Sequence, residues 1–257
     1  MIIDAYAQMG PGIANHASQL IIPMHDTSTP EGLIAIMDRI GIDRSIVFAP
    51  KWVGGRFVDP DYVQSNRYVA DAVKQHPKRL VGCARVNPNY GADAVKELER
   101  CLGEYGFKGV MLDPEWENFH PGDTALVYPL LEIARAKKAP VVFHSWYAPS
   151  EPALFWKVAT DFPDLQIVIA HMGGRLTVDA ALIAERAPNL NLETSDHMYR
   201  LGPFAKRLGV RRILFGTNTP FAAPEAELYK VTVRKDLTSE EKDLILGGNA
   251  ARLYGLG

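Results

Sequence analysis

Short hydrophobic runs alternate with longer amphipathic segments along the whole chain. In eight places the hydrophobic run is almost uninterrupted, as in Ile167–Ala170, which is typical of strands covered on both faces in a parallel sheet. The predicted strands are Ile2–Ala7, Ser45–Ala49, Leu80–Val86, Gly109–Leu112, Val141–His144, Ile167–His171, Leu190–Glu193 and Ile213–Gly216.

The segments between these runs carry helix start signals. Thr29 and Asp59 each precede a proline and then an apolar helical spacing, Asp123 precedes another such spacing, and Thr238–Glu241 has the pattern of a capping box. A strand followed by a helix eight times predicts an α/β fold, a single (β/α)8 TIM barrel spanning residues 1–257. A doubly wound open sheet is the competing architecture, but the glycines after the first strand lack the GxGxxG spacing usual there.

Composition narrows the class of protein. Of the 257 residues, 47% are hydrophobic and 23% charged, as in ordinary globular proteins with a sizeable core. The formal charge of −2 offers no basic field to nucleic acid or an anionic membrane, and no apolar run is long enough to span a bilayer. Cys83 and Cys101 lie in apolar sequence without metal-site spacing, so we expect buried free thiols and a reducing cytoplasm.

Polar side chains gather where the predicted strands end, which is the active-site face of a barrel. His144 and His171 end two consecutive strands, where an imidazole can ligate a metal or act as acid or base. A structural histidine is the plainer interpretation of one such residue, but two on adjacent strands favour a functional site. The other strand-end candidates are Asp4, Tyr6, Gln8, Asp113, Glu193 and Asn218.

A cation and three aromatic residues are further candidates for binding substrate. Arg85, at the end of the third strand, can pair with a substrate carboxylate, or it can neutralise Asp113 or Asp4. Trp52, Trp116 and Trp146 fall in loops at the same face, where they suit a flat small molecule or simply pack over the barrel mouth. We therefore expect a small-molecule substrate.

Six short motifs, taken in order, resemble the amidohydrolase superfamily. They are Ile3-Asp4, Phe107–Val110, Val142–His144, Ile169–Gly174, Ile213–Pro220 and Gly248–Tyr254. The nearest branch contains aminocarboxymuconate-semialdehyde decarboxylase, resorcylate-type decarboxylases and several hydrolases and lactonases. This resemblance implies an amidohydrolase-like barrel whose active site usually binds a divalent metal.

The chain departs from that family at the metal ligands. Members usually carry His-x-His at the end of strand one, a strand-five histidine and an aspartate after strand eight. Here Tyr6 and Gln8 stand at the first two positions and Asn218 at the last, leaving His144, while His171 matches the strand-six histidine. Because a catalytic metal needs about three good ligands, we expect no cofactor. The alternative is a divalent metal such as zinc at a rearranged site of His144, His171 and either Asp113 or Glu193.

The expected function is hydrolysis of a small, carbonyl- or lactone-containing aromatic or carboxylated molecule without the usual metal, as in some lactonases of the superfamily. His171 or His144 would act as general base, while Tyr6, Gln8 and Asn218 would donate hydrogen bonds to the oxyanion. Two alternatives are a metal-dependent hydrolase or decarboxylase with a rearranged ligand set, and a catalytically inactive barrel that binds a ligand. The final proton acceptor and a homo-oligomeric state stay open.

Overall fold

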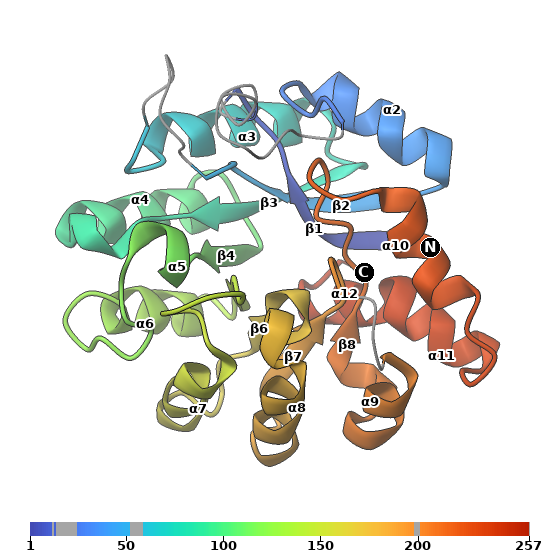
Figure 1. Ribbon diagram of the computed structural model, residues 1–257. Helices are drawn as coiled ribbons and strands as arrows, with labels where there is room; N and C mark the ends of the chain where they lie inside the picture. Colours follow the sequence, from blue (N-terminus) through green and yellow to red (C-terminus); the bar gives the residue numbers. More distant parts are fainter. Residues whose placement is uncertain (12, 14–24, 52–58, 198–200, 257) are drawn as a thin grey trace.

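The computed structural model describes residues 1–11, 13, 25–51, 59–197 and 201–256. These residues contain eight strands, paired in parallel in the order of the sequence (Figure 1). The strands are β1 (Ile3–Gln8), β2 (Arg44–Phe48), β3 (Leu80–Arg85), β4 (Gly109–Leu112), β5 (Val141–Phe143), β6 (Ile167–Ile169), β7 (Leu190–Glu193) and β8 (Ile213–Leu214). All eight predicted strands are confirmed: β4 and β7 have the predicted bounds, and the ends of the others differ by at most two residues.

The first strand meets the segment that follows the last, which closes the sheet. Ala5 N donates to Phe215 O at 2.8 Å, and Gln8 N donates to Thr219 O at 2.8 Å. Ala7 forms a parallel bridge with Thr219. Contacts between β1 and the end of β8 distinguish a barrel from an open sheet, so the TIM barrel is confirmed and the doubly wound alternative is wrong.

Helices surround the strands in Figure 1. Thr29 caps α2 through its side chain, and the capping box predicted at Thr238 and Glu241 is formed. The helix predicted after Asp123 begins later, at Tyr128, because Asp123 accepts bonds from a preceding turn. The α-helices are α2 (Pro30–Ile40), α3 (Val63–Gln75), α4 (Ala92–Gly103), α5 (Pro114–Glu117), α6 (Tyr128–Ala136), α7 (Pro152–Asp161), α8 (Thr177–Arg186), α9 (Leu201–Leu208), α10 (Pro224–Thr232), α11 (Ser239–Asp243) and α12 (Asn249–Leu253).

Shorter helical turns complete the chain: η1 (Pro88–Tyr90), η2 (Ala170–Leu176), η3 (Val210–Arg212) and the π-helical η4 (Leu244–Gly248). No helix among the described residues has both the length and the apolar character that a membrane span requires.

The hydrophobic core has two layers. One lies between the strands and the outer helices, and the other fills the barrel interior with alternate strand residues such as Ile46 and Val142. Leu253 and Tyr254, at the end of α12, pack into this inner layer. Cys83 and Cys101 are both buried and unpaired, as expected. Apolar side chains fill the inner layer, so the polar side chains inside the barrel lie at the carboxyl ends of the strands.

Candidate active site

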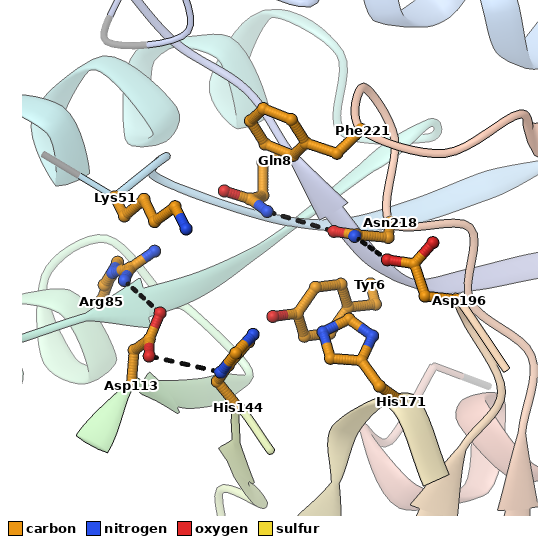
Figure 2. Close-up of a pocket in the computed structure, with 10 residues that line it drawn as sticks. All are labelled: Tyr6, Gln8, Lys51, Arg85, Asp113, His144, His171, Asp196, Asn218 and Phe221. Atoms are coloured by element: carbon orange, nitrogen blue, oxygen red, sulfur yellow. Dashed lines mark hydrogen bonds and ion pairs between the residues drawn. The ribbon is translucent and has the colours of Figure 1, made fainter. Parts of the chain in front are cut away.

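A pocket of about 240 Å3 opens at the carboxyl ends of the strands (Figure 2). Each strand, or the residues that follow it, contributes at least one lining side chain. These are Tyr6, Gln8, Lys51, Arg85, Asp113, His144, His171, Asp196, Asn218 and Phe221. Pockets for drug-sized ligands occupy roughly 300–1,000 Å3, so this volume suits a smaller molecule.

The backbone that carries His171 is left-handed. His171 has φ of +56° and Met172 φ of +48°, a conformation that costs roughly 1–3 kcal/mol for each residue other than glycine. Gly173 and Gly174 follow with positive φ, and a Cβ on Gly173 would lie 2.6 Å from Ala180 Cβ. Gly173 is thus required where this backbone approaches α8 closely. This tight turn directs the His171 side chain into the pocket.

A buried chain of hydrogen bonds holds the His171 ring from behind. His171 Nδ1 lies 2.9 Å from Ser195 Oγ, and Ser195 Oγ donates to Glu193 Oε2 at 2.8 Å. Glu193 Oε2 also accepts from His171 N at 3.1 Å. With Ser195 donating to Glu193, the oxygen of Ser195 accepts from a protonated Nδ1. The unprotonated Nε2 of His171 is then left for the pocket.

Burial determines the protonation states of His171 and Glu193 in this hydrogen-bonded row. It lowers the pKa of His171 well below 6.5, and the positive charge of His144 lowers it further. Burial also raises the pKa of Glu193 to about 8, although Ser195 and His171 donate hydrogen bonds that oppose the change. His171 is therefore neutral near pH 7. Glu193, expected as a substrate-binding residue, instead lies behind Ser195. Because its Oε2 accepts from Ser195 and from His171 N, the proton that Glu193 holds is on Oε1.

His144 lies beside two carboxylates. Its Nδ1 is 3.4 Å from Asp113 Oδ1 and 3.6 Å from Glu115 Oε2, and its ring centroid is 5.0 Å from that of His171. Burial would raise the pKa of Asp113, but the positive charges of His144, Arg85 and Lys51 outweigh it and hold the pKa below its usual range. An ionised Asp113 therefore lies beside the His144 ring.

Arg85 is held by two carboxylates of this chain. Its Nη2 lies 2.9 Å from Asp113 Oδ2 and 2.8 Å from Glu117 Oε1, and the guanidinium is buried. Tyr62 donates its hydroxyl to the same Glu117 oxygen at 2.5 Å. Of the alternatives for Arg85, the structure places it on Asp113 and away from Asp4. Glu117, which was not among the predicted site residues, reaches Arg85 from α5.

Lys51 is a second cation that the sequence analysis missed, although it stands at the carboxyl end of β2. Its Nζ lies 4.2 Å from the centroid of the Trp116 ring. Burial lowers the pKa of Lys51, against the opposing charge of Asp113. Lys51 Nζ has no carboxylate within ion-pair distance in the part of the chain that the structure describes. Its ammonium group is thus available to an anion in the pocket.

Two amide side chains form a line across the opposite wall. Gln8 Nε2 donates to Asn218 Oδ1 at 3.2 Å, and Asn218 Nδ2 donates to Asp196 Oδ2 (Figure 2). One N–H of each amide is thus engaged within the protein. Burial raises the pKa of Tyr6 well above 10, so its hydroxyl stays protonated. Tyr6 is therefore a more available donor than Gln8 or Asn218.

The remaining candidates lie outside the pocket lining. Asp4, expected to bind substrate, accepts from Thr217 N at 2.9 Å and from Thr217 Oγ1 at 2.6 Å, and so ties β1 to the end of β8. The Trp116 ring makes a cation–π contact with Lys51. The Trp146 ring packs against His171, with the ring centroids 5.9 Å apart. Trp52 lies outside the described residues.

A family model described as Amidohydrolase matches residues 31–256. This chain belongs to the amidohydrolase family. It is 24% identical over 237 residues to 2-amino-3-carboxymuconate-6-semialdehyde decarboxylase of Dictyostelium discoideum, covering 74% of this chain and 65%, less than two thirds, of that relative. It is 23% identical over 260 residues to 2-keto-4-carboxy-3-hexenedioate hydratase of Sphingobium, covering 82% of this chain and 76% of that protein.

Solved structures share the amidohydrolase fold. The crystal structure of 5-carboxyvanillate decarboxylase from Sphingomonas paucimobilis superposes with a TM-score of 0.76 at 16% identity, covering 99% of this chain and 98% of the other. A dihydroxybenzoic acid decarboxylase from Polaromonas, solved with bound manganese, gives a TM-score of 0.71 at 18% identity, covering 99% and 97%. The predicted family is confirmed, and these likenesses add support for its fold.

The pocket of this amidohydrolase does not fit a divalent metal. Gln8 and Asn218 bond to each other, and amide oxygens are weaker metal ligands than imidazole or carboxylate. Among the described residues, no three histidine, cysteine or acidic side chains converge as a metal site. Of the carboxylates expected for a rearranged site, Asp113 is paired with Arg85 and Glu193 lies behind Ser195, so neither is directed at the two histidines as a free ligand. We therefore assign no catalytic step to a metal.

Proposed function

We propose that this amidohydrolase hydrolyses a small lactone or ester that carries a carboxylate, with His171 as general base and without a metal. One observation carries the proposal. The ring of His171 is neutral and buried, its Nδ1 is held by Ser195, and its Nε2 is left to the pocket. A neutral imidazole fixed in one orientation is well suited to take a proton from water.

The two histidines divide the proton transfers. Water between the substrate carbonyl and His171 gives its proton to Nε2 while its oxygen forms a bond to the carbonyl carbon. The tetrahedral intermediate then breaks the bond to the leaving oxygen, and protonated His144 donates a proton to that oxygen. Asp113, 3.4 Å from His144 Nδ1, stabilises the protonated ring before this transfer. The products are a carboxylic acid and an alcohol or enol.

Tyr6 is placed to stabilise the intermediate. Its hydroxyl is protonated and belongs to the pocket lining, so it can donate to the carbonyl oxygen as negative charge develops. The second N–H of each amide, on Gln8 and Asn218, supplements it. In mutagenesis, loss of one such donor typically costs about 10²–10³-fold in kcat. Among the three expected donors, Tyr6 therefore has the largest role.

The test is turnover of a panel of lactones and aryl esters, with and without a carboxylate. Wild type is compared with His171→Ala and His144→Ala, and with His120→Ala as the matched control, because His120 is exposed and outside the pocket. We expect both pocket variants to lose at least about 10²-fold in kcat and the control to match wild type. Equal turnover by wild type and both pocket variants would overturn the assignment.

Lyase activity is the second candidate, because the two curated relatives are named as a decarboxylase and a hydratase. A positioned His171 and His144 would serve proton transfer to carbon as well as to oxygen. The same panel therefore includes aromatic and unsaturated carboxylates, followed by carbon dioxide release and by absorbance of the double bond. Turnover of these carboxylates and of no lactone or ester would show a lyase reaction in place of hydrolysis. Binding of the compounds without turnover of any of them would favour the non-catalytic alternative.

A further inference from the structure

The carboxamide oxygen of Gln8 is a polar atom that the proposed reaction does not use. Gln8 is only 6% exposed, and its buried Oε1 has no hydrogen-bond partner among the residues that the structure describes. The residue lines the pocket, and Figure 2 shows the amide oxygen on the side away from Asn218. A buried acceptor without a donor costs about 1–3 kcal/mol, so an occupant that supplies a donor is favoured.

The neighbouring residues determine which end of the amide faces the pocket. Asp196, at one end of the line, accepts from Asn218 Nδ2, which leaves Asn218 Oδ1 to accept from Gln8 Nε2. If both amides were reversed, Asn218 Oδ1 would face the carboxylate of Asp196, and two acceptors would meet. The charge of Asp196 therefore fixes Gln8 Oε1 as an acceptor in the pocket.

Lys51 lines the same pocket and is a hydrogen-bond donor, whereas Gln8 Oε1 is an acceptor. Its Nζ can only donate, it stacks on the Trp116 ring, and no described carboxylate lies within ion-pair distance. Asp113 and Asp196, the carboxylates of the lining, are held by Arg85 and Asn218 respectively. A carboxylate of the substrate would thus meet an ammonium group that no carboxylate of the described residues pairs with, and the hydrogen bond between them would be charge-assisted.

We propose that Gln8 and Lys51 select a hydroxylated carboxylate: a substrate hydroxyl donates to Gln8 Oε1, and a substrate carboxylate binds Lys51 Nζ. The inference rests on the proposed function for the reaction that follows binding. The recognition itself requires only the pocket. A substrate with hydrogen or a methoxy group in place of the hydroxyl leaves Gln8 Oε1 without a donor, which is expected to weaken binding about 10- to 100-fold.

The test uses binding, measured by titration calorimetry with the 2-, 3- and 4-hydroxybenzoates and the methoxybenzoate of each isomer. Wild type should bind at least one hydroxybenzoate about tenfold or more tightly than its methoxy counterpart. Gln8→Met removes the acceptor at similar size and should abolish this ratio. Gln75→Met, an exposed glutamine at the end of α3, is the matched control and should keep it. Circular dichroism and Tm verify that each variant is folded.

A second variant separates the two contacts. Lys51→Met should weaken binding of the selected hydroxybenzoate about tenfold or more and leave binding of the corresponding hydroxybenzyl alcohol unchanged. The inference is overturned if no hydroxybenzoate binds more tightly than its methoxy counterpart to wild type, or if Gln8→Met keeps the discrimination.

The selection of a hydroxylated carboxylate and the proposed hydrolysis are tested by different measurements, so one can be contradicted without the other. Hydrolysis of lactones with and without a hydroxyl at equal kcat/KM would contradict the selection and leave the proposed hydrolysis intact. The expected binding ratios without turnover of any lactone would support the selection and contradict the hydrolysis.

Discussion

Replacing Glu193 by glutamine tests whether this buried carboxyl group holds a proton beneath His171. Burial raises the pKa of Glu193 from 4.5 to about 8. At about 1.4 kcal/mol for each pKa unit, this difference corresponds to about 5 kcal/mol. Between these pH values the folded protein keeps a proton that the unfolded chain has lost. The free energy of unfolding should therefore fall as the pH rises from 4.5 towards 8, by up to that amount from Glu193 alone.

Glu193→Gln removes this titration, so the decline in stability between pH 5 and pH 8 should be smaller by several kcal/mol. The assay is urea unfolding of both proteins at the two pH values. The change in stability between the two pH values is the readout, because any cost of placing a carboxamide next to Ser195 and His171 that is the same at both pH values cancels in it.

A matched control is Glu99→Gln, because Glu99 is exposed on α4. This variant should keep the wild-type decline. If wild type and Glu193→Gln lose the same free energy between pH 5 and pH 8, Glu193 is ionised in the folded protein and the reasoning on the buried chain is refuted.

Three further predictions concern the turn and the chain that hold His171. Ser195→Ala should lower kcat by up to about tenfold, with little change in KM, since it removes one positioning hydrogen bond of roughly 0.5–1.5 kcal/mol; an unchanged kcat would contradict the role of Ser195. The pKa of His171 lies well below 6.5, so kcat/KM should stay level as the pH falls through 6.5, and a loss of activity towards low pH with its half-maximum at or above 6.5 would contradict a buried neutral base. Gly173→Ala places a Cβ 2.6 Å from that of Ala180 at positive φ and should cost about 1–3 kcal/mol in urea unfolding, whereas Gly103→Ala, with no atom within 4 Å of its Cβ, should match or exceed wild type.

The barrel could be predicted because its strands are buried on both faces. Runs such as Ile167–Ile169 and Val141–Phe143 contain no polar residue, and strand pairing in sequential order follows from short connections that each carry a helix. The same logic located His144 and His171, because the residue that ends a barrel strand stands at the active-site face.

The direction of each polar side chain could not be predicted from its place at a strand end. Asp4 and Glu193 lie in the strands themselves and bond to Thr217 and Ser195 beneath the pocket. Asp196, three residues after Glu193, reaches the pocket because its backbone turns to φ of +54°. Turns of this kind depend on contacts between loops, which the pattern of hydrophobic residues does not record.

Residues that act through another element were the hardest to predict. Glu117 lies on the short helix α5 and pairs with Arg85 on β3, 32 positions away. Lys51 could have been predicted, because it stands in the loop that follows β2 at the active-site face, as Arg85 stands at the end of β3.

The central claim is acid–base catalysis by His171 without a metal. The most direct measurement is kcat/KM on the best lactone of the panel, with metal content determined by mass spectrometry on the same sample, before and after dialysis against a chelator. We predict metal well below one equivalent per chain and no change in kcat/KM after chelation. Loss of activity on chelation, restored by one equivalent of zinc or manganese, would contradict the account.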